Sequence, residues 1–182
     1  MQSYRQPIQA KNPKRQYQGM VNRAQGKHFE SLIDDACTYY EAKGVASIEK
    51  TPEPMRPIKD LGNGKFVAHF MKKAQPDYKG VLNGGRAVMF EAKFTTMDTM
   101  EQSRVSSEQG QGLDVYAALG AVCFVLVAFD RRGHYRIPWS VWRGMKAKYG
   151  RLYVKPEELD EYKISFTNGI LQILDDLQTA GQ

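Results

Sequence analysis

The sequence predicts an α/β fold with a mixed central β-sheet flanked by helices. One reason is the order of its patterns: a helical segment is followed by three strands, a helix, a strand and further strand and helix segments, which is typical of a layered fold. Another is the apolar run Ala121–Phe129, whose length and β-branched residues favour a central strand covered on both faces. A chain of 182 residues is long enough to bury such a core in one domain.

The first regular segment has the periodicity of an amphipathic helix that begins near Phe29. Apolar residues recur there at the 3.6-residue spacing that gives a helix one apolar face; they are Phe29, Leu32, Ile33, Ala36 and Tyr40. Gly44 ends this helix. Val45–Lys50 then has the pattern of a first strand, which the proline-containing segment Thr51–Pro54 ends.

The segment Pro76–Lys93 is predicted to fold as two short strands joined by a tight turn. An Asn-Gly-Gly sequence at 83–85 supplies the turn, because these residues tolerate positive φ angles. The apolar run Ala87–Phe90 after it is typical of a buried strand.

Three charged side chains lie at the ends of this hairpin. Glu91 and Lys93 are two positions apart, so on a strand they leave the same face, and the hairpin brings Asp77 back beside them. Two carboxylates and an ammonium group suit a hard cation such as Mg²⁺, which proteins usually hold with one or two carboxylates. The alternative is a solvated strand face on which Glu91 and Lys93 form a weak ion pair.

The second half of the chain supplies the remaining elements. We expect helices at Ser107–Leu119 and Trp139–Tyr149, a strand at Gly133–Pro138 and a closing amphipathic helix at Asn168–Leu177. The segment from Arg131 to Lys155 contains eight basic residues and no acid, which makes it a candidate phosphate-binding surface.

The net charge of the chain is concentrated at its N-terminus. The chain has 26 Lys and Arg against 20 Asp and Glu, yet residues 1–28 hold six basic residues and no acid. We therefore predict a basic, flexible arm over residues 1–25, because a polar stretch of this kind cannot bury enough apolar surface to fold alone. Such arms often bind nucleic acid, and the alternative is a solubilising tail.

Cysteine usage and hydropathy indicate the compartment. Cys37 and Cys123 each fall in an apolar segment, and their spacing suggests neither a metal site nor a disulfide framework. Two buried thiols fit a reducing cytoplasm. The sequence has no run of eighteen apolar residues and no apolar segment after its basic start, so we expect a cytoplasmic protein that does not enter a membrane.

The hairpin also carries a resemblance to known nucleases. Pro76-Asp77, thirteen residues and then Glu91-Ala92-Lys93 resemble the PD-(D/E)XK nuclease motif, and the longer string around them is similar to RecU-type Holliday junction resolvases of Gram-positive bacteria and their phages. Further stretches resemble that family in the same order, from about residue 26 to the end of the chain: Gly26–Glu30, Tyr39-Tyr40, Lys50–Pro54, Gln109 and Cys123–Val125.

The resemblance implies a restriction-endonuclease-like core over residues 26–182 and a metal-dependent mechanism. Asp77, Glu91 and the carbonyl of Ala92 would hold Mg²⁺ or Mn²⁺, which lowers the pKa of a bound water and stabilises charge on the phosphate. Lys93 would position that water or stabilise the transition state. The product would be a nick with a 5′-phosphate.

Two more residues receive roles from the resemblance. Gln109 would donate a hydrogen bond to the scissile phosphate or to a metal-bound water, and Glu30 of the first helix would approach the metal. Each also has a plain alternative, since Gln109 suits a solvated first turn and Glu30 is a first-turn acid favoured by the helix dipole. The chain departs from the family pattern at Phe94, where an acid is usual, and at Gln75-Pro76, where the family has threonine.

The resemblance also places a protruding stalk at about residues 55–75, which would enter the centre of the junction. The basic residues predicted to bind DNA belong to the arm or to the stalk; they are Arg15, Arg23 and Lys27, and Lys59, Lys65, Lys72 and Lys73. The alternative for the stalk is an ordinary hairpin with a solvated basic face.

The predicted function is metal-dependent resolution of Holliday junctions in DNA recombination and repair. Symmetric cutting of a four-way junction needs two sites, so a homodimer is implied. RecU-type proteins also contact a RecA-like recombinase. Two alternatives stay open: a PD-(D/E)XK nuclease that acts on linear or flapped DNA, and a DNA-binding protein that modulates a recombinase without cutting.

Overall fold

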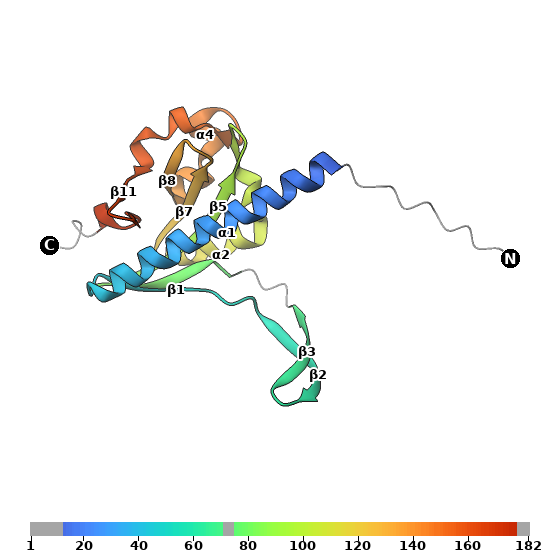
Figure 1. The fold of residues 1–182 in the computed structure, drawn as a ribbon. Helices are drawn as coiled ribbons and strands as arrows, with labels where there is room; N and C mark the ends of the chain where they lie inside the picture. Colours follow the sequence, from blue (N-terminus) through green and yellow to red (C-terminus); the bar gives the residue numbers. More distant parts are fainter. Residues whose placement is uncertain (1–12, 71–74, 178–182) are drawn as a thin grey trace.

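The computed structural model describes residues 13–70 and 75–177. Its centre is a six-stranded sheet with the order β1-β4-β5-β7-β8-β10 (Figure 1). The β5–β7 pair is parallel and the other four neighbouring pairs are antiparallel, so the predicted mixed sheet is confirmed. The strands of this sheet are Ala46–Lys50 (β1), Tyr78–Leu82 (β4), Ala87–Thr95 (β5), Val122–Phe129 (β7), Gly133–Pro138 (β8) and Lys163–Ile164 (β10).

Helices cover both faces of the sheet, as the sequence predicts. The helix bounds are Pro13–Ala42 (α1), Ser107–Ala118 (α2), Trp139–Arg143 (α3) and Met145–Tyr149 (α4). Alternate residues of β7 enter two different cores, because side chains leave a strand on opposite faces. Phe124 and Leu126 pack with α1, whereas Val125 and Val127 pack with α2, α3 and α4. The prediction that β7 is a central strand covered on both faces is thus confirmed.

The helix α1 is longer than the sequence pattern predicts. It begins at Pro13 rather than near Phe29, and its N-terminal turns extend past the sheet (Figure 1). The apolar stripe marks only the part of the helix that packs on the core. The earlier turns are rich in Lys, Arg, Gln and Met, which favour a helix by propensity alone, and proline is well placed in a first turn.

The C-terminal segment corrects a second prediction, because residues 168–177 do not form one amphipathic helix. They contribute instead to a short hairpin, β11 (Phe166–Thr167) with β12 (Ile170–Leu171), followed by the 3₁₀ turn Asp175–Leu177. Asn168 and Gly169 both have positive φ angles, 54° and 81°, as a two-residue hairpin turn requires. The apolar residues of this segment therefore enter the core from a hairpin.

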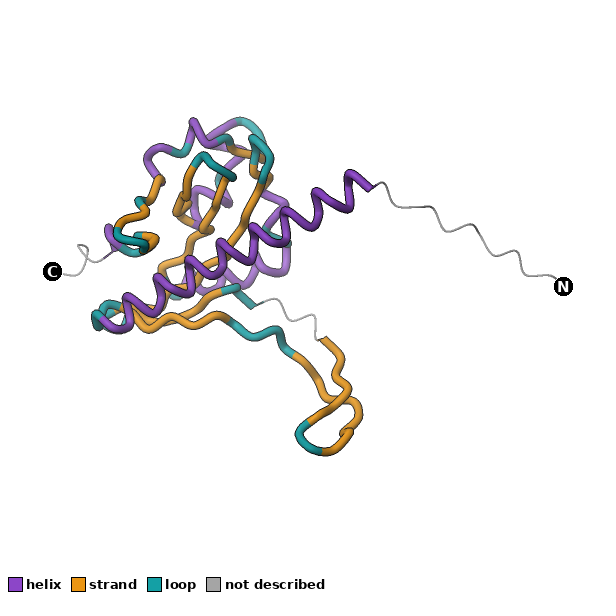
Figure 2. Tube along the Cα trace, in the orientation of Figure 1, coloured by secondary structure: helices purple, strands orange, loops and turns teal. Residues whose placement is uncertain are grey.

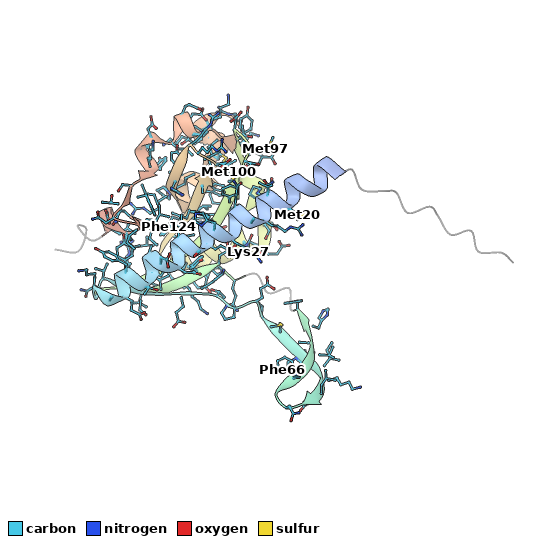
Figure 3. The ribbon with its side chains drawn as sticks, viewed as in Figure 1. Met20, Lys27, Phe66, Met97, Met100 and Phe124 are labelled. Atoms are coloured by element: carbon cyan, nitrogen blue, oxygen red, sulfur yellow. The ribbon has the colours of Figure 1, made fainter. Side chains whose placement is uncertain are left out.

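A separate two-stranded hairpin forms the stalk. Its strands are β2 (Met55–Gly62) and β3 (Lys65–Phe70), and it stands away from the central sheet (Figures 1 and 2). Nearly every residue of both strands is exposed, and Phe66 lies near the tip of the hairpin (Figure 3). Large apolar side chains are among the exposed ones: Met55, Ile58, Leu61, Phe66, Val67 and Phe70.

The strands β1 and β4 lie unusually close at one position. Ile48 pairs with Gly80 across the two strands. A Cβ atom on Gly80 would lie 2.2 Å from the backbone oxygen of Ser47 and 2.6 Å from the Cα atom of Ile48. Real side chains do not make such contacts, so only glycine fits here without moving β1.

Short elements complete the described chain. They are β6 (Met100–Glu101), which pairs with β9 (Tyr153–Val154), and the 3₁₀ turns Gln102–Arg104, Pro156–Glu158 and Asp160–Tyr162. Cys37 and Cys123 are buried and unpaired, so their prediction as core residues is confirmed. Within residues 13–70 and 75–177, no helix has the length and apolar character needed to span a membrane.

Candidate active site

The antiparallel register of β4 and β5 sets Asp77 opposite Glu91. Tyr78 pairs with Phe90 at the end of the ladder, and Asp77 is the next residue outward on its strand. Its Oδ2 atom accepts a hydrogen bond of 3.0 Å from the backbone N–H of Ala92. The site therefore lies where β4 begins, at the point where its pairing with β5 stops.

Lys93 joins the two carboxylates. Its Nζ atom lies 2.7 Å from Glu91 Oε2 and 3.2 Å from Asp77 Oδ2. The Glu91 side chain is fully buried, Lys93 is 13% exposed and Asp77 is 35% exposed. The structure thus brings together the three charged residues that the sequence predicts, with Asp77 as the member that faces solvent most.

The electrostatics of the site show how unusual Glu91 is. Burial raises the pKa of Glu91 most strongly, Lys93 lowers it and the charge of Asp77 raises it, which leaves the pKa of Glu91 at about 8. Burial alone would lower the pKa of Lys93, but Asp77 and Glu91 together leave it above its ordinary value. A buried carboxylate is costly unless positive charge is close, so the site favours a cation beside Glu91.

Several observations test whether a hard cation fits here. The second carboxylate oxygen of Glu91, Oε1, is buried and has no hydrogen-bond partner. The carbonyl of Ala92 is expected on the same edge of β5 as its N–H, because both backbone groups of a strand residue face one neighbour. In the described ranges no three Asp, Glu, His or Cys side chains are placed to hold a metal ion together, so the candidate donors at this site are the two carboxylates and the Ala92 carbonyl. Such an all-oxygen set fits Mg²⁺ or Mn²⁺.

Gln109 reaches the site from the first turn of α2. Its Nε2 atom donates a hydrogen bond of 2.6 Å to Glu91 Oε2, the same oxygen that Lys93 contacts. Ser106 is the N-cap of this helix and forms a capping box with Gln109. The Ser-x-x-Gln spacing is a known signature of a helix start, so Ser106 could have been found from the sequence.

A stack of aromatic rings supports the site from within the sheet. The rings of Tyr78 and Phe90 stack with centroids 4.8 Å apart, and those of Phe90 and Phe124 at 4.6 Å. Tyr78 is the first paired residue of β4 and follows Asp77 directly. The stack therefore fixes β4 beside β5 at the position where the carboxylates meet.

Glu30 does not join this cluster in the described structure. It lies on α1, which packs on the sheet face opposite to Gln109 and α2. Its carboxylate accepts a hydrogen bond of 2.6 Å from Lys50 Nζ at the end of β1. Sequence reasoning missed Lys50 as its partner, because the two residues meet only after folding.

The basic residues predicted to bind DNA lie in two places. Arg23 and Lys27 lie on the exposed side of α1, and Arg15 belongs to the first turns of the same helix. Lys59 and Lys65 are exposed on the stalk. Lys72 and Lys73 lie outside the described residues, as do residues 1–12 of the arm.

The basic side chains of segment 131–155 are more often paired with acids than the sequence indicates. Four of its side chains form ion pairs with acids from other segments, and the pairs are Arg132 with Asp98 and Glu157, Arg143 with Asp114, Lys148 with Glu161, and Arg151 with Glu158. These acids offset the positive charge of four of the eight basic residues, so less unpaired charge is left for phosphates than the sequence count indicates, and the phosphate-binding surface stays a prediction.

Comparison with known proteins adds independent information. The model of the family described as "Recombination protein U" matches residues 24–180. The chain is 32% identical over 149 residues to a Holliday junction resolvase RecU of Streptococcus sanguinis. The aligned stretch covers 77% of this chain and 74% of that protein. It is 33% identical over 129 residues to the RecU of Streptococcus equi subsp. zooepidemicus, and this alignment covers 68% of this chain and 62% of the relative.

Among solved structures, the chain is similar to Hjc, a Holliday junction resolvase of Archaeoglobus fulgidus. The TM-score is 0.38 and the sequence identity is 18%, over 64% of this chain and 75% of that one.

Proposed function

Because this chain belongs to the recombination protein U family, we propose that it is a metal-dependent endonuclease that resolves Holliday junctions. The observation that carries the proposal is the cluster of Asp77, Glu91 and Lys93 where β4 begins. It lies inside the matched part of the chain and is open to solvent on the side of Asp77. The proposal places the protein among DNA recombination and repair enzymes of the bacterial cytoplasm, which the unpaired thiols of Cys37 and Cys123 suit.

The cation would be held by oxygen atoms that already converge. Asp77, Glu91 and the carbonyl of Ala92 would contribute them, and the unpartnered Oε1 atom of Glu91 is the donor with no other role in the described structure. A bound Mg²⁺ or Mn²⁺ supplies activation of water and stabilisation of phosphate charge. A site with only two carboxylates leaves places for substrate phosphate, which is the usual arrangement for Mg²⁺.

Two further side chains would act on the phosphate directly. Lys93 keeps its proton, since both carboxylates raise its pKa, and its ammonium group would stabilise negative charge that develops in the transition state. Gln109 would donate a hydrogen bond in the same place, because its amide already points at the carboxylate cluster. We assign no catalytic role to Glu30 in the described state, since Lys50 holds it elsewhere.

DNA binding would come from the arm and the stalk. Arg15, Arg23 and Lys27 on α1, and Lys59 and Lys65 with Lys72 and Lys73 of the stalk, would contact phosphates, which fix register and orientation on DNA. Symmetric cutting of a four-way junction needs two sites, which two copies related by a two-fold axis would supply. We keep a RecA-like recombinase as a further proposed partner.

A cleavage assay on three DNA substrates tests the proposal. Equal amounts of four-way junction, flap and linear duplex are incubated with the protein in Mg²⁺, with and without chelator. We expect junctions to be cut in preference and chelator to stop all cutting. Preferred cutting of flap or duplex would instead support the general PD-(D/E)XK nuclease, and tight binding without any cutting would support the non-cutting modulator of a recombinase.

A further inference from the structure

The first turn of α2 holds Gln109 by two reciprocal hydrogen bonds. The Oγ atom of Ser106 accepts from the backbone N–H of Gln109 at 3.2 Å. In return, Oε1 of the Gln109 side chain accepts from the backbone N–H of Ser106 at 3.1 Å. This capping box therefore fixes the side chain of Gln109 as well as the start of the helix.

The capping box decides which end of the Gln109 amide faces the site. A primary amide has one acceptor oxygen and one nitrogen with two N–H donors. Because Ser106 occupies the oxygen, the nitrogen is turned to Glu91, where one N–H donates at 2.6 Å. A flipped amide would set its oxygen against the carboxylate and its NH₂ group against the Ser106 N–H, and both contacts would repel. The second N–H takes part in no hydrogen bond within the described chain, so it is available to a phosphate oxygen.

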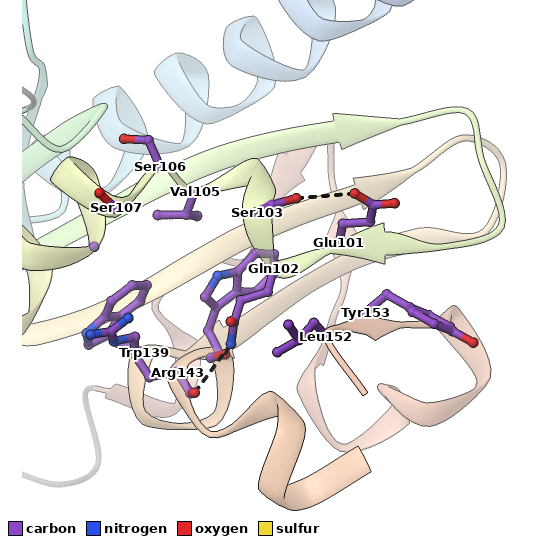
Figure 4. Close-up of a pocket in the computed structure, with 12 residues that line it drawn as sticks. Glu101, Gln102, Ser103, Val105, Ser106, Ser107, Trp139, Arg143, Leu152 and Tyr153 are labelled. Carbon is purple, nitrogen blue, oxygen red and sulfur yellow. Dashed lines mark hydrogen bonds between the residues drawn. The ribbon is translucent and has the colours of Figure 1, made fainter. Parts of the chain in front are cut away.

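Packing fixes only part of this turn. Gly110 is buried beside the ring of Trp139, whereas Ser106 and Ser107 are exposed and line, with both of these residues, a pocket of about 570 Å³ (Figure 4). The helix also contains glycine at 110 and 112, which disfavours helical structure by up to about 1 kcal/mol per residue. A first turn that is weak in propensity and has an exposed start depends on its cap.

We propose that Ser106 is a positioning residue for DNA cleavage: its Oγ atom anchors the first turn of α2 through the backbone N–H of Gln109, and its own backbone N–H then holds the Gln109 side-chain amide toward Glu91 and the scissile phosphate. The inference rests on the proposed nuclease function and extends it by one residue. Ser106 acts through Gln109, so it should affect turnover more than DNA affinity, which comes mainly from basic groups.

Three substitutions test the proposal in the full-length protein. Ser106→Ala removes the Oγ atom that accepts from the Gln109 backbone N–H and keeps the Ser106 backbone N–H, so the first turn and the amide that it carries lose one of two anchors. We expect kcat on a four-way junction to fall roughly 5- to 10-fold, which corresponds to about 1.0 to 1.4 kcal/mol in the activation free energy. The junction Kd, measured in chelator, should stay within about twofold because no phosphate contact is lost. Ser106→Thr keeps a hydroxyl cap and should restore turnover. Ser107→Ala is the matched control, since this neighbouring serine lines the same pocket but does not cap Gln109.

A double-mutant cycle separates positioning from simple stabilisation. In a Gln109→Ala background, Ser106→Ala should cause no further loss of kcat, because the group that it positions is gone. Ser106→Ala should lower the melting temperature both in the parent protein and in the Gln109→Ala background. Nuclear magnetic resonance of the metal-free protein gives a second readout: the two side-chain amide protons of Gln109 should change in shift and exchange faster in Ser106→Ala, but not in Ser107→Ala.

The possible failures can be told apart. A parent protein that cuts junctions, together with a Ser106→Ala variant that cuts equally fast, would overturn the positioning role and leave the nuclease function standing. Losses of kcat that multiply fully in the double mutant would also overturn it. A folded parent protein that cuts no DNA would overturn the proposed function, and the positioning role with it.

Discussion

Two charged regions of this protein are candidate sites in the sequence, and the structure treats them differently. The first is the cluster of Asp77, Glu91 and Lys93 at the start of β4 and within β5, and the second is the basic segment 131–155. In the first region, both carboxylates and the ammonium group belong to one hairpin, so its register alone brings them together. In the second region, acids that lie outside the segment pair with four of its basic side chains.

The difference shows what a count of charges can and cannot predict. Within a hairpin, alternation and register fix which side chains meet, and both can be inferred from the sequence. A run of basic residues does not show which acids pair with it, whether they follow it directly in the sequence, as Glu157, Glu158 and Glu161 do, or come from distant segments, as Asp98 and Asp114 do. The first region therefore remains a strong candidate site, whereas the second is expected to have little influence on DNA.

The largest expected effect comes from Asp77→Asn, which is nearly isosteric but removes one negative charge from the proposed cation site. It should bind four-way junctions as well as the parent protein or better in chelator, because a repulsive charge is gone. It should fail to cut them in Mg²⁺, because the cation is lost or misplaced. Gel-shift and cleavage measurements on the same junction, with thermal melting to show folding, provide the check. Cutting at the parental rate would mean that this region is no metal site.

Lys93→Ala should lower kcat about 100- to 1000-fold, as expected for the loss of one group that stabilises the transition state. The fold should survive, since Glu91 has a raised pKa and can take a proton when its ammonium partner is gone. Single-turnover cleavage at saturating protein measures the effect. Lys79→Ala, at an exposed position of β4, serves as the control for losing a lysine from the same hairpin. Near-parental turnover by the folded variant would exclude a catalytic lysine at 93.

Deletion of the N-terminal arm should weaken DNA binding and flatten its dependence on salt. Removal of residues 1–24 takes away five basic residues, so the slope of log K against log salt should fall by at most ~4.5. Removal of residues 1–12 takes away only two of them and leaves α1 whole, so the slope should fall by at most ~1.8. Titrations by fluorescence anisotropy at several salt concentrations would measure both slopes. An unchanged slope for the longer deletion would show that the arm does not contact DNA.

The smallest expected effect is that of Arg132→Gln, in the basic segment, on DNA binding. Arg132 already pairs with Asp98 and Glu157, so Arg132→Gln should change the junction Kd less than about twofold and leave the salt slope unchanged. Lys65→Gln on the stalk is the matched variant, and it should reduce the slope by about 0.9 if its side chain contacts a phosphate. A larger effect at Arg132 than at Lys65 would reverse the comparison and make the basic segment a DNA-binding surface.

Much of the fold could be predicted because local patterns decide it. The alternation and turn chemistry of residues 76–93 predicted β4, its turn and β5, and the apolar run at 121–129 predicted β7. The stalk was predicted from the family resemblance. The start of α1 was missed because residues 13–28 have no apolar stripe in the sequence. The predicted C-terminal helix is wrong because Asn168-Gly169, a strong signal for a hairpin turn, outweighs the helical spacing of the apolar residues.

The candidate site shows a similar division. Asp77, Glu91 and Lys93 meet because one hairpin carries them, so sequence reasoning could bring them together. Gln109 approaches from another element, and only the resemblance suggested it. The pairing of Glu30 with Lys50 depends on how α1 lies across the sheet, which no local pattern determines.

The tight approach of β1 and β4 at Gly80 limits which substitutions this position can tolerate. Gly80 lies three residues from Asp77 in the same strand region, and any side chain there would push β1 away or displace β4. In a saturation mutagenesis library selected for cleavage, Gly80 should therefore tolerate as few replacements as Asp77 or Glu91. The intolerance of Gly80 would come from steric exclusion alone. In a selection for folding without activity, Gly80 should still tolerate few replacements, whereas Asp77 and Glu91 should tolerate many.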